Sequence, residues 1–504
     1  MSLTVTDNGG LTASSTQTVN IGSFPNVNPV PQFSSSLNAL LVGFNAAGST
    51  DNGTITNYAW NFGESNSTTN TATGVTTTHG YKFAGSYTVT LVVTDNRGAS
   101  VTTAQGVTVS PPSAVTTGQL NDTGITASQC YQAGTDTFVL CSSALAIATV
   151  GQSVTSFAPQ DGMTGRDTST SNTALDGALG FSFTKIGASG ETLPASATQW
   201  SCVKDNVTGL MWERKTNDGG LYDISRTFTH LDNTNSAQFV TGAFPTLVQI
   251  NAATNSIGFK NAVNADALCG ATDWRLPETD ELQSIADYSS ASTNVLGTAW
   301  FTVSAKGNSY ISAAAAAALP PTDHVIFSGG ATGVQQGVTR EVQSASIRLV
   351  RGAPSSPPAS PRFQVNGQEV FDSKTGLTWR ICAEGMTYSP TGGLCTGTPF
   401  GLSHEGALIQ AAAVGQGWRL PNIKELNSIV DRNFGNNDNL PTLDPVAFPG
   451  ATVGIFWAST PLTQLSTFAW SVNFQQGFVN LSNRNAIEIN VNRVRLVRDT
   501  FVGD

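Results

Sequence analysis

The sequence predicts a multidomain, β-rich protein in which a β-sandwich is followed by two copies of an α+β domain. Alternating valine and threonine segments around Asp-Asn turns dominate the N-terminal part of the chain. A set of motifs occurs twice in the second half, in the same order. The chain has 504 residues, enough for several domains that each bury their own core.

The composition is typical of an exported, β-rich surface protein. Charged residues make up 12% of the chain, about half the usual share, and neutral polar residues replace them. The net charge is -10 and the pI is about 4.9, and there is no basic run. We therefore expect no nucleic-acid partner.

No segment is long and apolar enough to span a membrane, and the longest low-complexity stretch, 313–318, is far too short. Met1 leads directly into a strand pattern, without a signal peptide. These features predict a fragment of a longer exported protein, or export by another route.

Residues 1–24 predict the last hairpin of a preceding sandwich domain. Leu3 to Gly10 recur as Leu91 to Gly98, so the offset is 88 residues, and the match continues to Val19 and Val107. Alternating apolar residues around an Asp-Asn turn are typical of two antiparallel strands. Because a lone hairpin is barely stable in water, we expect it to be the tail of a preceding domain or to pair with something else.

Residues 25–111 contain a complete copy of this pattern. Tyr58-Ala-Trp-Asn-Phe-Gly is followed by Tyr81-x-Phe and by a long Tyr-x-Val-x-Leu-x-Val-x-Asp strand that ends at Asp95. These residues resemble a polycystic kidney disease (PKD) domain, an immunoglobulin-like sandwich that is commonly a spacer on secreted bacterial proteins. Asn61 and Glu64 depart from the family pattern, which argues against a carboxylate-based metal site in that loop.

The six cysteines form three local couples, and none has the C-x-x-C spacing of zinc or thioredoxin-type sites. Disulfides in an oxidising compartment are the favoured interpretation, and buried free thiols are the alternative. The predicted couples are Cys130 with Cys141, Cys202 with Cys269, and Cys382 with Cys395.

We expect a disulfide-closed connector over residues 112–200. Its turn-rich stretch contains Asp161 and Asp167, which offer too few oxygen ligands for a calcium loop. A solvated turn is the favoured interpretation, so no metal or cofactor is predicted, with Ca²⁺ kept as the alternative.

Three landmarks define the duplicated domain. They are Thr-Gly-Leu-x-Trp (208–212 and 375–379), Trp-Arg-Leu-Pro (274–277 and 418–421) and Arg-Leu-Val-Arg (348–351 and 495–498). Alanine-rich composition predicts a first helix over 261–268 and over 404–414. A second helix is expected after each Arg-Leu-Pro, with Pro277 or Pro421 in its first turn.

The rest of the second copy predicts strands, followed by a closing strand. The expected segments are 456–460, 468–474, 478–481 after a Gln-Gln-Gly turn, and 491–497. The first copy lacks the Ala-Trp-x-Val-x-Phe motif found at 469–474, and we expect it to be degenerate.

The landmarks resemble the Lcl C-terminal domain family of bacterial surface proteins. This resemblance implies two α+β domains related to the C-type-lectin-like fold, a scaffold that displays binding loops. The expected organisation is 1–24 terminal hairpin, 25–111 PKD-like sandwich, 112–200 connector, 201–352 first Lcl C-terminal-like domain, 353–361 proline-rich linker and 362–504 second Lcl C-terminal-like domain.

We interpret Trp-Arg-Leu-Pro as architectural, because the same motif serves two different loop regions. The tryptophan is expected in the core, and the arginine beside a carboxylate such as Glu281 or Glu425.

The candidate ligand-binding residues lie in the late strands of the second copy. Amide side chains donate and accept hydrogen bonds, which suits hydroxyl-rich or peptide ligands, and aromatic faces suit stacking; a solvated polar face is the equally weighted alternative. The candidates are Trp457, Ser459, Trp470, Asn473, Gln475, Gln476, Asn480, Asn483, Arg484, Asn485, Asn490 and Asn492.

We expect no enzyme, because the four histidines are scattered and no H-E-x-x-H, G-x-S-x-G or P-loop pattern occurs. The predicted function is adhesin-like recognition, outside the cell or on the bacterial surface, of a cell-surface, matrix or glycan ligand. One alternative is a filament or appendage subunit that contacts neighbouring copies by strand addition through the N-terminal hairpin. Another is the non-catalytic targeting region of a secreted hydrolase.

Overall fold

The structure is a computed structural model. It describes residues 1–19, 25–38, 41–64, 69–81, 85–109, 120–142, 158–164, 180–233, 244–289, 300–302, 309–313, 323–328, 334–341, 345–352, 361–431, 434, 440–485 and 492–499. The chain divides into two compact units, Met1–Ser113 and Ala114–Val502. In the described part, no helix has the length and apolarity needed to cross a membrane.

The N-terminal hairpin consists of β1 (Ser2–Thr6) and β2 (Thr12–Thr16), paired antiparallel as the repeat predicts. Its turn is built like the turn between β8 (Gly85–Asp95) and β9 (Ser100–Val109). The Asp7 carboxylate accepts the N–H groups of Gly9 and Leu11, as the Asp95 carboxylate accepts those of Arg97 and Ala99. A carboxylate that holds two backbone donors fixes this turn in both copies.

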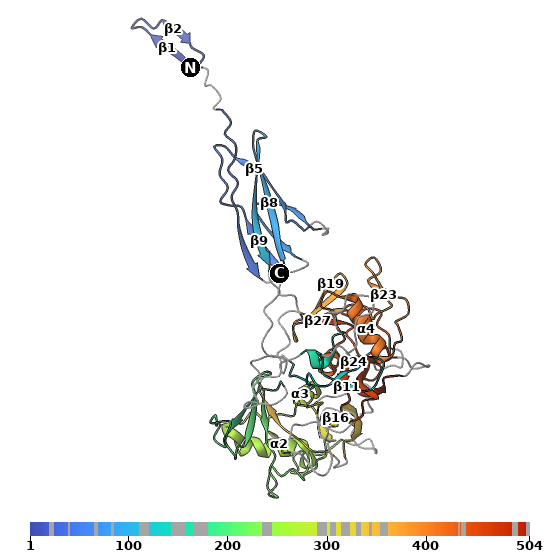
Figure 1. Cartoon of the computed structure of the whole chain (residues 1–504). Coiled ribbons are helices and arrows are strands. Elements are labelled where there is room, and N and C mark those ends of the chain that lie inside the picture. The colour runs from blue at the N-terminus through green and yellow to red at the C-terminus, as the bar shows by residue number, and fades with distance from the viewer. Residues whose placement is uncertain are drawn as a thin grey trace. The chain divides into compact units, whose positions relative to one another are not determined.

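Residues 25–109 form a sandwich of two antiparallel sheets. One sheet has the order β3 (Ser34–Asn38), β4 (Leu41–Asn45), β7 (Thr76–Gly80), and the other has the order β6 (Thr71–Thr73), β5 (Ile55–Asn61), β8, β9 (Figure 1). Alternate residues of β8, including Leu91 and Val93, are buried against Trp60 and Phe44. The predicted β-sandwich is therefore confirmed.

The loop that departs from the PKD pattern holds a buried hydrogen-bonded contact between a carboxyl group and an imidazole. Glu64 Oε2 lies 3.0 Å from His79 Nε2, and the His79 ring stacks on Phe62 with centroids 4.3 Å apart. Tyr81 Oη donates to Phe62 O, and burial raises the pKa of Tyr81 above its usual range. Glu64 thus has a structural partner in the core.

The duplication is visible in the second unit as two four-stranded sheets with the same topology. Their orders are β12 (Phe183–Ile186), β13 (Cys202–Asp205), β14 (Met211–Glu213), β18 (Val350–Arg351) and β19 (Phe363–Asn366), β20 (Glu369–Asp372), β21 (Leu377–Arg380), β27 (Val497–Asp499). The first strand of the first repeat, β12, comes from residues that the sequence analysis placed in the connector. It occupies the position of β19, although the two strands share little sequence beyond a leading phenylalanine.

In the described residues, each repeat also has a three-stranded meander and two corresponding helices. The first repeat has α2 (Ser256–Ala265), α3 (Thr279–Ser284) and the meander β15 (Ser309–Ile311), β16 (Asp323–Ser328), β17 (Val334–Thr339). The second has α4 (His404–Val414), α5 (Ile423–Ser428) and the meander β24 (Ile455–Pro461), β25 (Phe468–Asn473), β26 (Phe478–Asn483). The first repeat therefore keeps the meander although it lacks the Ala-Trp-x-Val-x-Phe motif.

Short elements complete the second unit. They are β10 (Cys130–Tyr131), β11 (Phe138–Val139), a 3₁₀ turn at Asp161–Met163, α1 (Leu247–Ile250), a 3₁₀ turn at Leu268–Gly270, β22 (Thr387–Ser389) and β23 (Leu394–Thr396). Two predicted segments have different bounds in the structure. The helix expected over 261–268 is α2, which begins at Ser256, and the closing strand expected over 491–497 is β27, which begins at Val497.

The Trp-Arg-Leu-Pro motif is architectural in both repeats, as predicted. Trp274 and Trp418 are buried. Arg419 donates twice to the Glu425 carboxylate, with both N–O distances 2.7 Å, and Arg275 pairs with Glu281 at 2.7 and 2.6 Å. These bidentate pairs fix the turn that leads into each following helix.

The prediction for the motif proline was wrong by two positions. Pro421 precedes the N-cap residue Asn422, and α5 begins only at Ile423. The Pro421 carbonyl instead accepts the N–H of Ser459, as the Pro277 carbonyl accepts the N–H of Ala313. The proline therefore ties the helix entry to the meander.

One hydrophobic cluster spans the two repeats, and each repeat contributes to a further cluster besides it. Leu282 of α3 and the following Ile285 lie in the same cluster as Leu426 of α5 and the following Ile429. The helix positions expected to be apolar are thus buried at the contact between the repeats. Asn427 donates to Gln283 across this contact.

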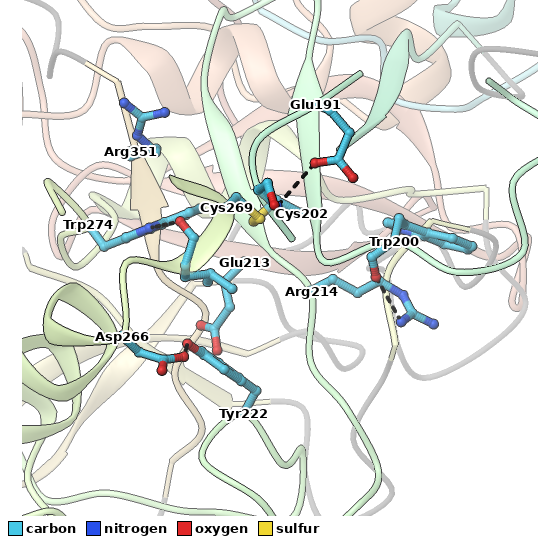
Figure 2. The surroundings of a disulfide bond; sticks show 12 residues. Glu191, Trp200, Cys202, Glu213, Arg214, Tyr222, Asp266, Cys269, Trp274 and Arg351 are labelled. Carbon is cyan, nitrogen blue, oxygen red and sulfur yellow. Dashed lines mark hydrogen bonds between the residues drawn. A yellow bond between two sulfur atoms is a disulfide. The ribbon is translucent and has the colours of Figure 1, made fainter. Parts of the chain in front are cut away.

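All three predicted disulfides are present, between Cys130 and Cys141, Cys202 and Cys269, and Cys382 and Cys395. They indicate an oxidising compartment. Figure 2 shows that the Cys202–Cys269 bond joins β13 to the segment after α2, beside the motif residue Trp274.

Replacing Cys202 and Cys269 by serine is expected to lower the free energy of unfolding of the second unit by about 4 kcal/mol. The two cysteines are 67 residues apart, so the cross-link restricts a long loop of the unfolded chain. The Cys130/Cys141 double serine variant, with a separation of 11 residues, should lose about 3 kcal/mol and serves as the comparison. Guanidinium denaturation would measure both; a larger loss for the shorter loop would contradict the expectation.

Candidate functional site

The structure removes several predicted residues from the candidate ligand-binding surface. The buried candidates are Trp457, Ser459, Trp470, Arg484 and Asn492. Asn490 lies outside the described residues. The expectation that the two tryptophans offer stacking faces is therefore wrong for this structure.

Each buried tryptophan packs against a specific aromatic residue. Trp470 packs edge-on against Tyr288 of the first repeat, with ring centroids 5.0 Å apart. Trp457 donates through Nε1 to Leu402 O and packs against His404. Neither face is available to a ligand, because both rings belong to the core.

The accessible candidates form two separate groups at opposite ends of β26. Asn473, Gln475 and Gln476 surround the turn between β25 and β26, whereas Asn483 and Asn485 follow at the far end. Six strand residues span about 17–20 Å, so one small ligand cannot contact both groups. Asn480 lies in between, opposite Ser471, and is partly exposed.

The turn group is held in place by its own amides. The Asn473 Oδ1 atom accepts the Gln475 N–H at 2.9 Å, and Asn473 Nδ2 faces Gln476 Oε1 at 3.4 Å. Gln476 is exposed, and Asn473 and Gln475 are partly exposed. Because a primary amide carries two donors and an acceptor, the exposed Gln476 side chain can hydrogen-bond a polar ligand.

Sequence reasoning missed Arg493, which lies close to this turn. Its backbone is paired with Ile455, the neighbour of Asn473 across β24 and β25. The guanidinium donates to Thr452 Oγ1 at 3.0 Å, and burial lowers the pKa of Arg493. Its side chain forms no ion pair with any residue that the structure describes.

Gly454 makes room for this arginine. A Cβ atom at position 454 would lie 2.4 Å from Arg493 Nη1, and Gly454 has a φ of +144°. The glycine allows the guanidinium to lie against the strand end. We call Asn473, Gln475, Gln476 and Arg493 the turn-end patch.

Three histidines lie in the interior and not at an exposed site. His79, His230 and His404 are buried at different places in the chain. Burial lowers the pKa of His230 to about 4 and the pKa of His404 to about 3. Within the described ranges, no group of three or more histidine, cysteine or acidic side chains is arranged to hold a metal ion.

The alternative of a calcium site near Asp161 is not supported by its surroundings. Asp161 is buried and accepts a hydrogen bond from Thr460 Oγ1, so the solvated turn expected there is also wrong. Asp167 lies outside the described residues.

The comparisons agree with this architecture. The model of the Lcl C-terminal domain matches residues 201–351 and 368–498, which together exceed half of the chain. The chain belongs to the Lcl C-terminal domain family. The PKD domain model matches residues 26–109, so a PKD domain precedes the two Lcl C-terminal domains.

The curated relatives match over a short part of the chain. The pre-pro-metalloprotease PrtV of two Vibrio cholerae serotype O1 strains is 38% identical over 90 residues, 18% of this chain. The match spans only 9% of the length of each relative.

Solved PKD domains show the same restricted likeness. The crystal structure of the PKD1 domain of Vibrio anguillarum Epp is 34% identical; the match covers 18% of this chain and 100% of that one, with a TM-score of 0.16. The PKD1 domain from the Vibrio cholerae metalloprotease PrtV is 38% identical; the match covers 17% and 99%, with a TM-score of 0.15. The turn-end patch of the second Lcl C-terminal domain lies outside these matches.

Proposed function

We propose that this chain is a non-catalytic recognition protein of the extracellular space. In this proposal the PKD domain is a spacer, and the two Lcl C-terminal domains are C-type-lectin-like binding modules. The turn-end patch of the second module contacts a hydroxyl-rich ligand, such as a cell-surface or matrix glycan.

The observation that carries this proposal is the exposed position of polar side chains at one end of the second meander. Asn473 pairs with Ile455, whose carbonyl accepts the N–H of Arg493, and the Arg493 guanidinium has no carboxylate partner among the described residues. Amides and guanidinium groups together recognise hydroxyls and anionic substituents. The motif residues, by contrast, are committed to internal pairs such as Arg419 with Glu425.

Binding to whole cells and to a glycan array should be measured with the complete chain, because one hydrophobic cluster spans the two domains. Replacing Asn473 and Gln476 by alanine, together with Arg493→Gln, is expected to weaken binding at least tenfold. Thr398→Ala alters an exposed residue of the same domain and should bind like the parent. Equal binding by both variants would move the site elsewhere.

Two other functions remain proposals with their own observations. Leu3 and Val5 of the hairpin are exposed, whereas Leu91 and Val93, their counterparts in the PKD domain, are buried; this favours strand addition between subunits of a filament. The PKD likeness to a metalloprotease favours a targeting region of a secreted hydrolase. Polymerisation of the complete chain without any surface binding would support the filament.

A further inference from the structure

Arg484 lies in a buried pocket on the second Lcl C-terminal domain that is filled by another part of the chain. Arg484 directly follows β26 and stands next to His404, whose backbone N–H donates to Arg484 O at 3.0 Å. Arg484 Nε also lies 3.3 Å from His404 Nδ1. Ala407, Leu408 and Trp457 belong to the same hydrophobic cluster as Tyr131, the residue that contacts this arginine.

The occupant is the connector loop that the Cys130–Cys141 disulfide closes. The ring of Tyr131 lies flat under the guanidinium of Arg484, with Cζ 3.3 Å from the ring centroid, and Tyr131 Oη donates to Phe468 O at 2.8 Å. Asp136 accepts a hydrogen bond from Arg484 Nη1 at 2.5 Å and another from Asn485 Nδ2 at 3.2 Å. The loop thus presents an aromatic ring and a carboxylate, the two groups that a guanidinium binds best.

A third contact fixes the tip of the loop. The Gly134 N–H lies 3.0 and 3.1 Å from the two carboxylate oxygens of Glu405, in the first turn of α4. The loop is therefore seated by directional contacts and is not merely packed over an apolar surface.

The first Lcl C-terminal domain has the same arginine with a different partner. Arg340 directly follows β17, the equivalent of β26, and its Nη1 donates to Asp232 Oδ2 at 2.9 Å. In both domains, therefore, the residue after the third meander strand is a buried arginine that donates to an aspartate. Both domains place an arginine at the same position, but the segment that supplies the carboxylate partner differs between them.

The origin of the two carboxylates follows from the chain lengths before the first helix. Phe228 and Leu402 form equivalent bridges, to Ala345 and Asn492. The helix α2 starts at Ser256, 28 residues after Phe228, whereas α4 starts at His404, two residues after Leu402. The additional segment of the first domain contains Asp232. The second domain lacks such a segment. The carboxylate partner of Arg484 therefore comes from a loop outside the domain.

We propose that the Arg484 pocket is a binding site for a loop bearing tyrosine and aspartate, that the connector loop occupies it in cis, and that a second copy of this chain can insert its connector loop in trans. This site differs from the turn-end patch, which lies at the other end of β26, and it requires no glycan ligand. Loop exchange of this kind links copies through a contact that each copy already makes with itself.

Two complementary variants of the complete chain test the exchange. Tyr131→Ala/Asp136→Asn removes the two loop groups and leaves the pocket intact, and Arg484→Gln impairs the pocket and leaves the loop intact. Mixed in equal amounts, they should form a heterodimer in sedimentation equilibrium, with a mass approaching twice that of one chain. Each variant alone should remain at the mass of one chain, or should associate at least tenfold more weakly than the mixture does.

Amide hydrogen exchange at Arg484 and His404 reports whether the cis loop has been released, and circular dichroism reports that the fold persists. We expect faster exchange at both amides in either variant. Arg340→Gln is the matched change in the first domain, and it should form no heterodimer when it is mixed with the loop variant. Release of the loop without heterodimer formation would overturn the trans site. Unchanged exchange in the loop variant would overturn the role of Tyr131 and Asp136 in seating the loop.

Discussion

Replacing Glu425 by alanine is expected to destabilise the second unit by about 3–5 kcal/mol, because it leaves a buried arginine without its principal partner. The Arg419 and Glu425 side chains are each 9% exposed. Glu425 also accepts the backbone N–H of Asn422 at the start of α5, so its loss uncaps the helix as well.

The first domain supplies the matched control. Glu281 makes the same two bonds to Arg275, but the side chains are 14% and 23% exposed, so water can partly replace the lost contacts. We expect Glu281→Ala to cost about half as much as Glu425→Ala. Urea or guanidinium denaturation of both variants would measure the difference; equal losses would show that burial does not set the strength of these pairs.

Stability should also depend on pH through the buried carboxyl group of Asp161. Burial raises the pKa of Asp161 from 3.8 to about 8, and the neighbouring Asp122 and Glu425 act in the same direction. The folded state therefore binds a proton that the unfolded chain releases. This contribution is fully present below about pH 4 and is lost as pH rises to about 8, and its size is on the order of a few kcal/mol.

Lys424, which lies beside these acids, acts with the opposite sign. Burial lowers the pKa of Lys424 to about 7, although Asp122, Asp287, Asp205 and Asp161 favour its charged form. Its Nζ atom donates to Asp122 O and Ser284 O, at the contact between connector and both domains. Its contribution to stability is present above about pH 10 and is lost as pH falls through 7.

The measurement is the melting temperature from pH 4.5 to 8 for the parent and for Asp161→Asn, which keeps the shape but cannot titrate. The parent should lose stability relative to Asp161→Asn as pH rises across this range. Asp218→Asn, at an exposed position, should follow the parent. Parallel curves for parent and Asp161→Asn would contradict the expected titration.

Local patterns predicted the secondary structure and the motif chemistry well. The helix expected over 404–414 coincides with α4, and the strands expected at 456–460 and 468–474 match β24 and β25 within a residue or two. These elements have periodic apolar positions and clear turn residues at their ends. The pairing of Arg419 with Glu425 was predictable for the same reason, since both lie in one short motif.

The candidate site was predicted less well, because burial depends on distant parts of the chain. Trp470 and Arg484 stand in a polar stretch, yet Tyr288 covers the first and Tyr131 covers the second. Nothing within the late strands indicates either cover. Arg493 was missed because its value as a site residue depends on the absence of a carboxylate partner in three dimensions, and sequence does not show this.

The hydrophobic cluster that spans the two domains has a consequence for how the molecule comes apart. Since α3 and α5 contribute to one hydrophobic cluster, neither domain can unfold without exposing apolar surface of the other. We therefore expect the two domains to unfold together, as an internal pseudodimer that the duplication produced. If the polypeptide were cut at the proline-rich linker, each half would expose apolar surface that is buried in the intact chain. Such halves would be expected to aggregate rather than to fold separately.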